Sequence, residues 1–262
     1  MRAAGATGRV THGGRRRSLL GLLAAIVSCG GQPLDAVSID PRSLNTALVA
    51  HWRFDEGSGV AVGDSSGNGH VGELTGGTWS PTGRFKGALA LTTGEFVTVK
   101  NFPQATASWT VSLWVKTSAA QLAVDQTDGA TILSTENVFE GGWQLHLDNR
   151  PGFERYDAAY WVGPNSSDYV VVTCGCIEID RWVHITAVFD SQAKQLTLYR
   201  DGIPTDQKSL PAPILPGDPT LYMGTWNMHS RFLTGVVDDF AIWSRALDPG
   251  EIAVLSRQPV GD

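Results

Sequence analysis

Short stretches of alternating apolar and polar residues run along most of the chain. In segment 109–115 every second side chain is apolar, namely Trp109, Val111, Leu113 and Val115. The residues between them are polar except Trp114. Because successive side chains of an extended chain point to opposite faces, this period of two predicts a half-buried β-strand. The same period recurs at 143–147 and at 183–189.

Further strands are expected where other short apolar runs occur, around residues 49–54, 88–91, 96–99, 131–134, 169–173, 221–224 and 235–243. The alternating run that ends at Leu198 leads into Asp201-Gly202, and an Asp-Gly pair after such a run is typical of a β-hairpin. A dozen or so strands favour two sheets packed face to face, because open twisted sheets of roughly that size fold over or split. The pattern therefore predicts an all-β fold, a two-sheet antiparallel sandwich.

One helix is predicted near the C-terminus. Asp248 can cap it, Pro249 suits the first helical position, and Glu251 completes a capping box. The helix is expected to end near Ser256. The 30 glycines and 13 prolines are spread along the chain, which suits the many turns of a β-rich fold.

Composition narrows the class of protein and of partner. The 262 residues, of which 42% are hydrophobic and 18% charged, suit one globular domain with a sizeable core. The formal net charge is -6, and no cluster of Lys or Arg follows residue 17. We therefore expect no nucleic-acid partner, because phosphate backbones are bound by basic surfaces.

The N-terminal residues have the pattern of an export signal. Arg15, Arg16 and Arg17 precede an apolar run, 19–27, that is shorter than the roughly 20 residues a permanent membrane helix needs. Residues 26–29, Ile-Val-Ser-Cys, resemble the lipobox of bacterial lipoproteins, in which the cysteine becomes the lipidated first residue. The alternative is an ordinary signal peptide beside a fortuitous cysteine, which would leave the exported protein soluble.

The lipobox resemblance divides the chain into a signal peptide (1–28), a lipidation site at Cys29, a flexible tether (29–44), a folded domain (45–258) and a short tail (259–262). We accordingly expect an exported protein of the cell envelope that touches the membrane through its lipid anchor only. Exposure to the periplasm or to the outside stays open at this point. So does the export route, because Arg16-Arg17 resembles the core of a twin-arginine signal.

The two other cysteines, Cys174 and Cys176, are separated by one glycine. Residues two apart on a strand lie at the upper edge of the Cα separation that a disulfide accepts, so a bridge needs a bend, which Gly175 permits. A disulfide and two free thiols both stay open. No further ligands lie nearby at the spacing of a zinc site, so we expect no metal at this pair.

Several motifs, taken in order, resemble one protein family. They are the segments 49–59, 64–70, 83–89, 112–116, 182–190, 198–202 and 235–247. Together they resemble the laminin G-like domains of the concanavalin A-like lectins and glucanases, over nearly the whole expected domain. The resemblance implies a jelly-roll sandwich with a short C-terminal helix, here carried by a bacterial lipoprotein.

The family resemblance also implies a structural calcium ion that links the loop 64–70 to the last strand. The expected side-chain ligands are Asp64, Asn68 and Asp238. The loop has the composition for this task, because Ca²⁺ prefers carboxylate, amide and backbone oxygens. The alternative is a metal-free loop in which Asp64 and Asn68 only make hydrogen bonds to the backbone.

Catalysis is not expected. Glu178-Ile179-Asp180 begins the E-x-D-x-x-E pattern of laminarinase-type hydrolases, but Val183 stands where the last acid is required. Hydrolysis of a glycosidic bond needs two suitably spaced carboxyl groups. Neither a nucleophile elbow nor a zinc-protease motif is present.

Two aromatic segments are candidates for ligand contact. Trp226 and His229 lie in an expected loop between strands, and Tyr160 and Trp161 precede another polar segment, 164–168. Aromatic rings can stack on sugars, although burial in the core is an equally good explanation for each of them. The sequence thus predicts an envelope-anchored binding module for glycans. The alternatives are a protein-protein interaction or adhesion module with the same fold and, more remotely, a divergent glycoside hydrolase.

Overall fold

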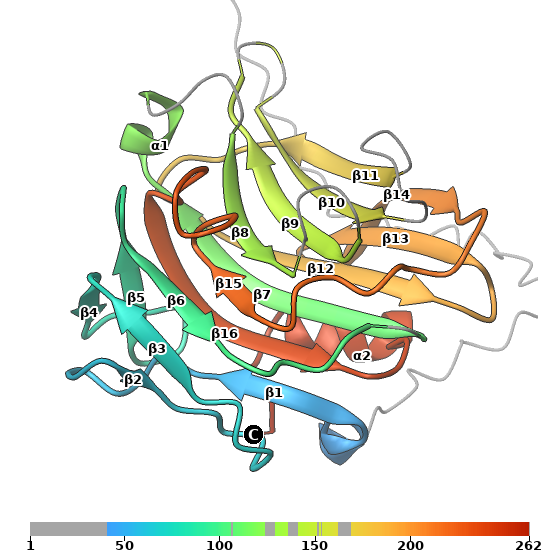
Figure 1. Ribbon diagram of the computed structural model, residues 1–262, viewed down its shortest axis with the longest axis horizontal. Helices are drawn as coiled ribbons and strands as arrows, with labels where there is room; N and C mark the ends of the chain where they lie inside the picture. Colours follow the sequence, from blue (N-terminus) through green and yellow to red (C-terminus); the bar gives the residue numbers. More distant parts are fainter. Residues whose placement is uncertain are drawn as a thin grey trace, which may run out of the picture. The chain divides into compact units, whose positions relative to one another are not determined.

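The computed structural model describes residues 41–105, 107–123, 129–135, 141–150, 152, 154–161 and 169–261. In this part of the chain, neighbouring strands pair antiparallel and form two eight-stranded sheets. The sheets lie face to face (Figure 1). The predicted sandwich is therefore confirmed.

Sheet A has a continuous path of seven strands and one more at its side. The path is β14 (Ile203–Ser209), β13 (Gln195–Arg200), β12 (Trp182–Asp190), β7 (Trp109–Thr117), β16 (Gly235–Trp243), β5 (Ala88–Leu91) and β4 (Thr78–Ser80). The additional strand, β1 (Leu48–Trp52), pairs with β16.

Sheet B is one path of eight strands. In order they are β11 (Tyr169–Cys176), β10 (Arg155–Trp161), β9 (Trp143–Asp148), β8 (Ala130–Ser134), β15 (Leu221–Met223), β6 (Phe96–Val99), β3 (Gly72–Thr75) and β2 (Ala61–Val62). The described helices are the 3-10 helix η1 (Pro41–Asn45), α1 (Ala119–Ala123) and α2 (Pro249–Leu255). Among the described residues, no helix is long and apolar enough to span a membrane.

The main core is the apolar layer between the two sheets. The alternating residues of β7 and β9 face this layer and are at most 2% exposed: Val111, Leu113, Val115, Trp143, Leu145 and Leu147. Burying a side chain of this size contributes about 1.5–3 kcal/mol. The period of two therefore fixes which face of each strand is turned inward and which is turned outward.

Trp114, the exception in the alternation of β7, lies on the outer face of sheet A. It is buried there because Arg84 lies over its ring at 4.3 Å and Phe85 meets it edge-on at 5.9 Å. His184 packs beside Trp114, and its Nε2 lies 2.8 Å from the hydroxyl of Ser112. The loop that carries Arg84 and Phe85 thus covers Trp114 on this outer face.

The hairpin predicted at Asp201-Gly202 is present between β13 and β14. Both turn residues have positive φ, 51° for Asp201 and 82° for Gly202. Two-residue hairpin turns of this kind match the twist of the paired strands. The Asp-Gly signal was therefore sufficient to place this turn.

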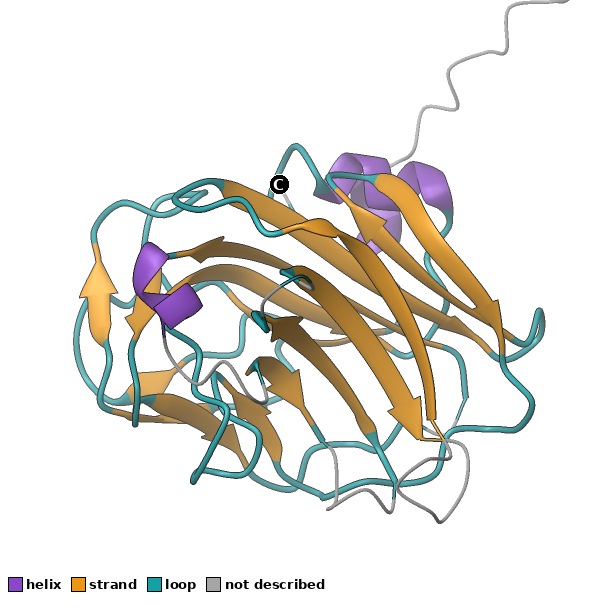
Figure 2. Ribbon diagram, turned by 90° about the horizontal axis from the view of Figure 1, so that it is seen from above, coloured by secondary structure: helices purple, strands orange, loops and turns teal. Residues whose placement is uncertain are grey.

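A second apolar cluster covers the outer face of sheet A with η1 and α2 (Figure 2). Leu44 of η1 is fully buried in it, and the carbonyl of Leu44 accepts a hydrogen bond from the Trp243 indole at 2.6 Å. Val260 is also buried. The packed fold therefore includes Leu44 and Val260, which the sequence had placed in the tether and the tail.

Helix α2 begins as its sequence predicts. Asp248 accepts a hydrogen bond from Glu251 N at 2.9 Å, and Glu251 accepts one from Asp248 N at 3.1 Å. The Glu251 carboxylate also receives two hydrogen bonds from Arg245 at 2.7 Å and one from Ser43 at 2.9 Å. Glu251 therefore joins η1, the segment after β16 and α2 through one buried carboxylate.

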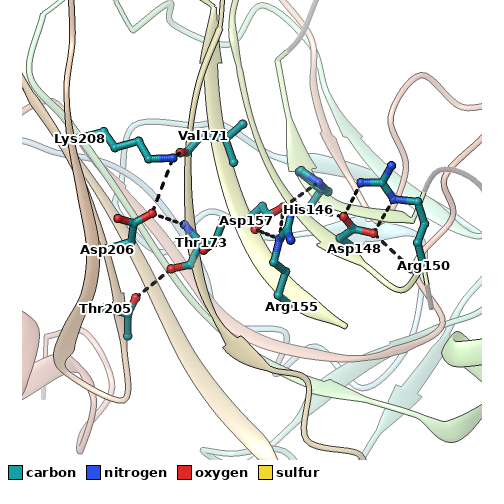
Figure 3. A network of polar contacts seen from close by, with 10 residues as sticks. All are labelled: His146, Asp148, Arg150, Arg155, Asp157, Val171, Thr173, Thr205, Asp206 and Lys208. Carbon is teal, nitrogen blue, oxygen red and sulfur yellow. Dashed lines mark hydrogen bonds and ion pairs between the residues drawn. The ribbon is translucent and has the colours of Figure 1, made fainter. Parts of the chain in front are cut away.

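The edges of the two sheets are joined at β11 and β14. Asp206 of β14 accepts a hydrogen bond from Thr173 N at 3.0 Å, and Lys208 donates to the Val171 carbonyl at 2.5 Å (Figure 3). Unpaired backbone groups at a sheet edge invite pairing with another chain. The side chains of β14 therefore protect part of the edge of β11.

We expect Glu251→Ala to lower the free energy of unfolding by about 2–4 kcal/mol, because it breaks a buried ion pair and the helix cap together. Urea denaturation measures this change. Glu73→Ala is the matched control, since Glu73 pairs with Lys100 but both side chains are exposed, 69% and 73%. The control should change stability by at most about 0.5 kcal/mol, and an equal loss in the two variants would contradict the role assigned to Glu251.

Candidate functional site

A row of polar side chains lies on the outer face of sheet B, where β8, β9 and β10 run side by side. We call this set the polar face: Thr131, Gln144, His146, Asp148, Arg155 and Asp157. The strand period puts these residues opposite the core residues Trp143, Leu145 and Leu147. The cross-strand register then pairs His146 with Asp157 and Asp148 with Arg155.

Two arginine–aspartate pairs organise the polar face (Figure 3). Arg150, just after β9, donates to both carboxylate oxygens of Asp148 at 2.8 and 2.6 Å. The Arg155 Nε donates to both oxygens of Asp157 at 3.0 and 3.1 Å. Arg155 Nη2 also lies 3.6 Å from Asp148, so the two pairs form one network.

Burial divides this network into an inner and an outer part. The side chains of Asp148 and Asp157 are only 2% and 3% exposed, whereas those of Arg150 and Arg155 are 46% and 29% exposed. Burial raises the pKa of Asp157 to about 6, even though Arg155 lowers it. Burial alone would also raise the pKa of Asp148, but the hydrogen bonds and charges of the arginines hold it below its ordinary value.

Three polar atoms of the polar face are buried and have no hydrogen-bond partner: Thr131 Oγ1, Gln144 Oε1 and His146 Nδ1. Burial and the charge of Arg231 lower the pKa of His146 to about 4, so its ring is neutral near pH 7. A buried polar group without a partner costs about 1–3 kcal/mol, so such groups are uncommon. A hydroxyl-rich ligand can supply partners of the required kinds, donors as well as acceptors.

The structure places the predicted loop of Trp226 and His229 next to the polar face. The loop connects β15 to β16, and Thr131 N donates to the Arg231 carbonyl at 2.8 Å. The Arg231 guanidinium lies over the half-buried ring of Trp226 at 4.6 Å. His229 is exposed, and its backbone N–H donates to the Asn227 side chain at 3.2 Å.

Three other predicted sites fall wholly or partly outside the described residues. The backbone of Tyr160 and Trp161 forms the end of β10, but their side chains and residues 162–168 lie outside the described part, as does Cys29. Cys174 is a buried free thiol, and burial raises its pKa to about 12. The side chain of Cys176 is not described, and the free thiol of Cys174 agrees with the alternative in which the two cysteines are not bridged.

The expected calcium ligand Asp64 is engaged by the backbone of its own loop and of β1. Its Oδ1 accepts from His51 N at 3.0 Å and Ser66 N at 2.9 Å, and its Oδ2 accepts from His70 N at 2.9 Å. These bonds outweigh burial and hold the pKa of Asp64 below its ordinary value. Asn68 donates to two carbonyls of β1 at 2.9 Å. Hydrogen bonds of Asp64 and Asn68 to the backbone are what the metal-free alternative predicts.

Asp238, the third expected ligand, has an environment that suits a cation better. Its Oδ2 accepts from Phe85 N at 2.9 Å, but its Oδ1 is buried without a partner, and burial raises its pKa to about 7. It lines a pocket of about 230 Å³ together with Asp55 and Asp239, but also with the cations Arg53 and Lys86. Asp64 and Asn68 are not among the described residues that line this pocket.

Among the described residues, no group of three or more His, Cys, Asp or Glu side chains is placed to hold a metal ion. The free Oδ1 of Asp238 fits a cation, whereas the oxygens of Asp64 already accept hydrogen bonds. The calcium site therefore stays a prediction.

Glu178, which begins the incomplete hydrolase pattern, forms ion pairs in the structure. It lies between β11 and β12, and its carboxylate forms ion pairs with Arg181 at 2.9 Å and with Arg200. Arg181 also pairs with Asp201 at 2.7 Å. Glu178, Arg181, Arg200 and Asp201 thus form one ion-pair cluster.

The sequence did not identify Asp148, Arg150, Arg155 or Asp157 as site residues. One signal was available, because every second residue of 143–148 is polar and two of these carry ionisable groups. Strand β10 was not predicted, so the partner row that completes the polar face was missing.

Calorimetry tests the calcium prediction. We expect calcium to raise the midpoint temperature of unfolding relative to EDTA, because a ligand that binds only the folded state stabilises it. Asp238→Asn should remove this shift. Equal midpoints for the wild-type protein in calcium and in EDTA would contradict the calcium site and support the metal-free loop.

Asp157 should leave a signature in the pH dependence of stability. Its pKa is about 6 in the folded protein and about 3.9 in an unfolded chain. Between about pH 4 and 6 the folded state therefore binds more protons than the unfolded chain does. The stability contributed by Asp157 grows as the pH falls through about 6 and is lost as the pH rises through it. The free energy of unfolding of the wild type, relative to Asp157→Asn, should rise between about pH 8 and 5 in urea denaturation. A constant difference would show that the folded-state pKa is not raised.

Comparison with known proteins shows which family this chain matches. A family model described as "Concanavalin A-like lectin/glucanases superfamily" matches residues 91–253, which is more than half of the chain. A search of curated proteins finds no match.

Solved structures with a similar fold include the binding domains of a mosquitocidal protein and of botulinum neurotoxins. The binding domain of Paraclostridial Mosquitocidal Protein 1 has a TM-score of 0.66 and 19% identity, over 81% of this chain and 52% of that one. The binding domain of botulinum neurotoxin serotype D has a TM-score of 0.64 and 17% identity, over 82% and 52%. The ligand binding domain of serotype D in complex with N-acetylneuraminic acid gives the same values. This chain spans about half the length of each, and at such identity the likeness concerns the fold. With the family match and the sandwich in agreement, the chain belongs to the concanavalin A-like lectin/glucanase superfamily.

Proposed function

We propose that the protein is a saccharide-binding module and that the polar face is its binding surface. The observation that carries this proposal is a row on the outer face of sheet B in which buried carboxylates and unpartnered polar atoms lie beside partly exposed guanidinium groups. Ordinary outer faces of antiparallel sheets are polar and solvated. Polar atoms that are buried without a partner are costly, which indicates a task other than packing.

The chemistry of the polar face suits a sugar. Thr131, Gln144 and His146 provide unpartnered hydrogen-bonding atoms, and sugar hydroxyls both donate and accept. Trp226 adds a half-buried aromatic ring at the border of this face, where a sugar ring can stack. Convergent polar groups beside an aromatic surface are the usual lining of a small-molecule site.

We propose binding without catalysis for this surface. Asp148 and Asp157, its two carboxylates, are buried and each is held by an arginine. Glu178, the remnant of a hydrolase motif, belongs to a separate ion-pair cluster. Membership of a family that includes lectins agrees with this proposal.

Envelope anchoring is a further part of the proposal. The chain enters the described domain through η1, which packs with α2 on the outer face of sheet A. The polar face belongs to the opposite side of the sandwich, on sheet B. A lipid anchor at Cys29 would be connected to the domain through the segment before η1.

Replacing Trp226 tests the binding surface. A glycan array with the purified protein identifies bound saccharides, and calorimetric titration then measures their affinity. Trp226→Ala should weaken binding about tenfold or more, because truncating an aromatic anchor of a binding surface commonly costs about 2 kcal/mol or more.

Trp182→Ala is the matched control. Trp182 is also half-buried with a cation over its ring, Lys116 at 5.2 Å, but it lies on sheet A. Its replacement should leave the affinity unchanged. Equal effects of the two substitutions, or no bound saccharide on the array, would overturn the proposed function.

A further inference from the structure

At the polar face, together with Arg150 just after β9, positive charges are exposed and negative charges are buried. The guanidinium-bearing side chains of Arg150 and Arg155 are 46% and 29% exposed, whereas Asp148 and Asp157 are 2% and 3% exposed. An approaching molecule therefore meets cationic groups first. This local excess of exposed positive charge contrasts with the chain as a whole, whose formal net charge is -6.

We infer that the saccharide bound at the polar face carries an oxyanion, a carboxylate or sulfate group, which contacts the guanidinium groups of Arg150 and Arg155. This inference rests on the proposed function and names the class of ligand for the same surface. Planar guanidinium groups bind such oxyanions through paired N–H donors, and an arginine is better suited to this than a lysine.

The buried carboxylates act as positioning residues. Asp148 holds two nitrogens of Arg150, and Asp157 holds the Nε of Arg155 with both of its oxygens. Each guanidinium plane is thereby fixed before a ligand arrives. Pre-ordered donors lose less conformational entropy on binding than flexible ones, so this arrangement favours affinity for a ligand of matching charge.

One further cation borders the polar face. Arg231 stands over the ring of Trp226, which places a positive charge beside the surface proposed for stacking. The charge of Arg231 also acts on His146 of the polar face.

The test compares saccharides that differ only in charge. Calorimetric titration of the full protein uses oligogalacturonic acid against its methyl ester, and dextran sulfate against dextran. We expect the charged member of at least one pair to bind tenfold or more tightly than its neutral counterpart, and this preference to weaken with added salt. The first pair reports carboxylate recognition and the second reports sulfate recognition.

Arg150→Gln should remove most of the preference for the charged saccharide. Arg181→Gln is the matched control, because Arg181 is also 46% exposed and ion-paired, but within the Glu178 cluster. The double variant Arg150→Gln/Asp148→Asn avoids a buried unpaired carboxylate, so that a folding defect is not mistaken for a binding defect. Urea denaturation verifies that each variant is folded.

Equal binding of charged and neutral saccharides would overturn this inference and leave the proposed function standing. An equal loss of the preference for the charged saccharide in the Arg150→Gln and Arg181→Gln variants would overturn it as well. Failure of the protein to bind any saccharide, charged or neutral, would overturn both proposals.

Discussion

The rest of the structure depends on the apolar layer between the two sheets. Because side chains alternate along a strand, burying Trp143, Leu145 and Leu147 in this layer forces Gln144, His146 and Asp148 to the outer face of sheet B. The register with β10 then brings Asp157 and Arg155 beside them. A slip of one residue would exchange the two sets, so the core that stabilises the sandwich also sets the composition of the polar face.

The second constraint is electrostatic. Two carboxylates that are nearly inaccessible to water need partners, and Arg150 and Arg155 provide them within the same two strands and the loop after β9. The same pairing turns the guanidinium groups outward. In the proposed function, stability and recognition use one network: the inner atoms neutralise buried charge, and the outer atoms meet the ligand. On the outer side of sheet A, Glu251 joins η1 to α2.

Patterns among residues close together in the sequence predicted strands, a hairpin turn and a helix cap. The alternation of β7 and β9, the turn at Asp201-Gly202 and the capping box of Asp248 and Glu251 all lie where the sequence places them. The polar face could not be predicted in this way, because it forms only when β9 and β10 pair, and their register depends on contacts across the whole sheet. Leu44 was misplaced for a related reason, since the apolar cluster in which it is buried includes Trp243, far away in the chain. The calcium ligands came from family resemblance and from the oxygen-rich composition of their loop, and the hydrogen bonds of Asp64 show a role for this residue without a metal.

The central claim is that a ligand contacts the outer face of sheet B through side chains that the core and the buried carboxylates hold in place. Nuclear magnetic resonance of the arginine Nε–H and tryptophan indole N–H groups during saccharide titration tests it most directly. The account predicts that the signals of Arg150, Arg155 and Trp226 shift together along one binding curve, while those of Arg181 and Trp182 stay in place. Shifts confined to the region of Asp238, or to sheet A, would contradict it.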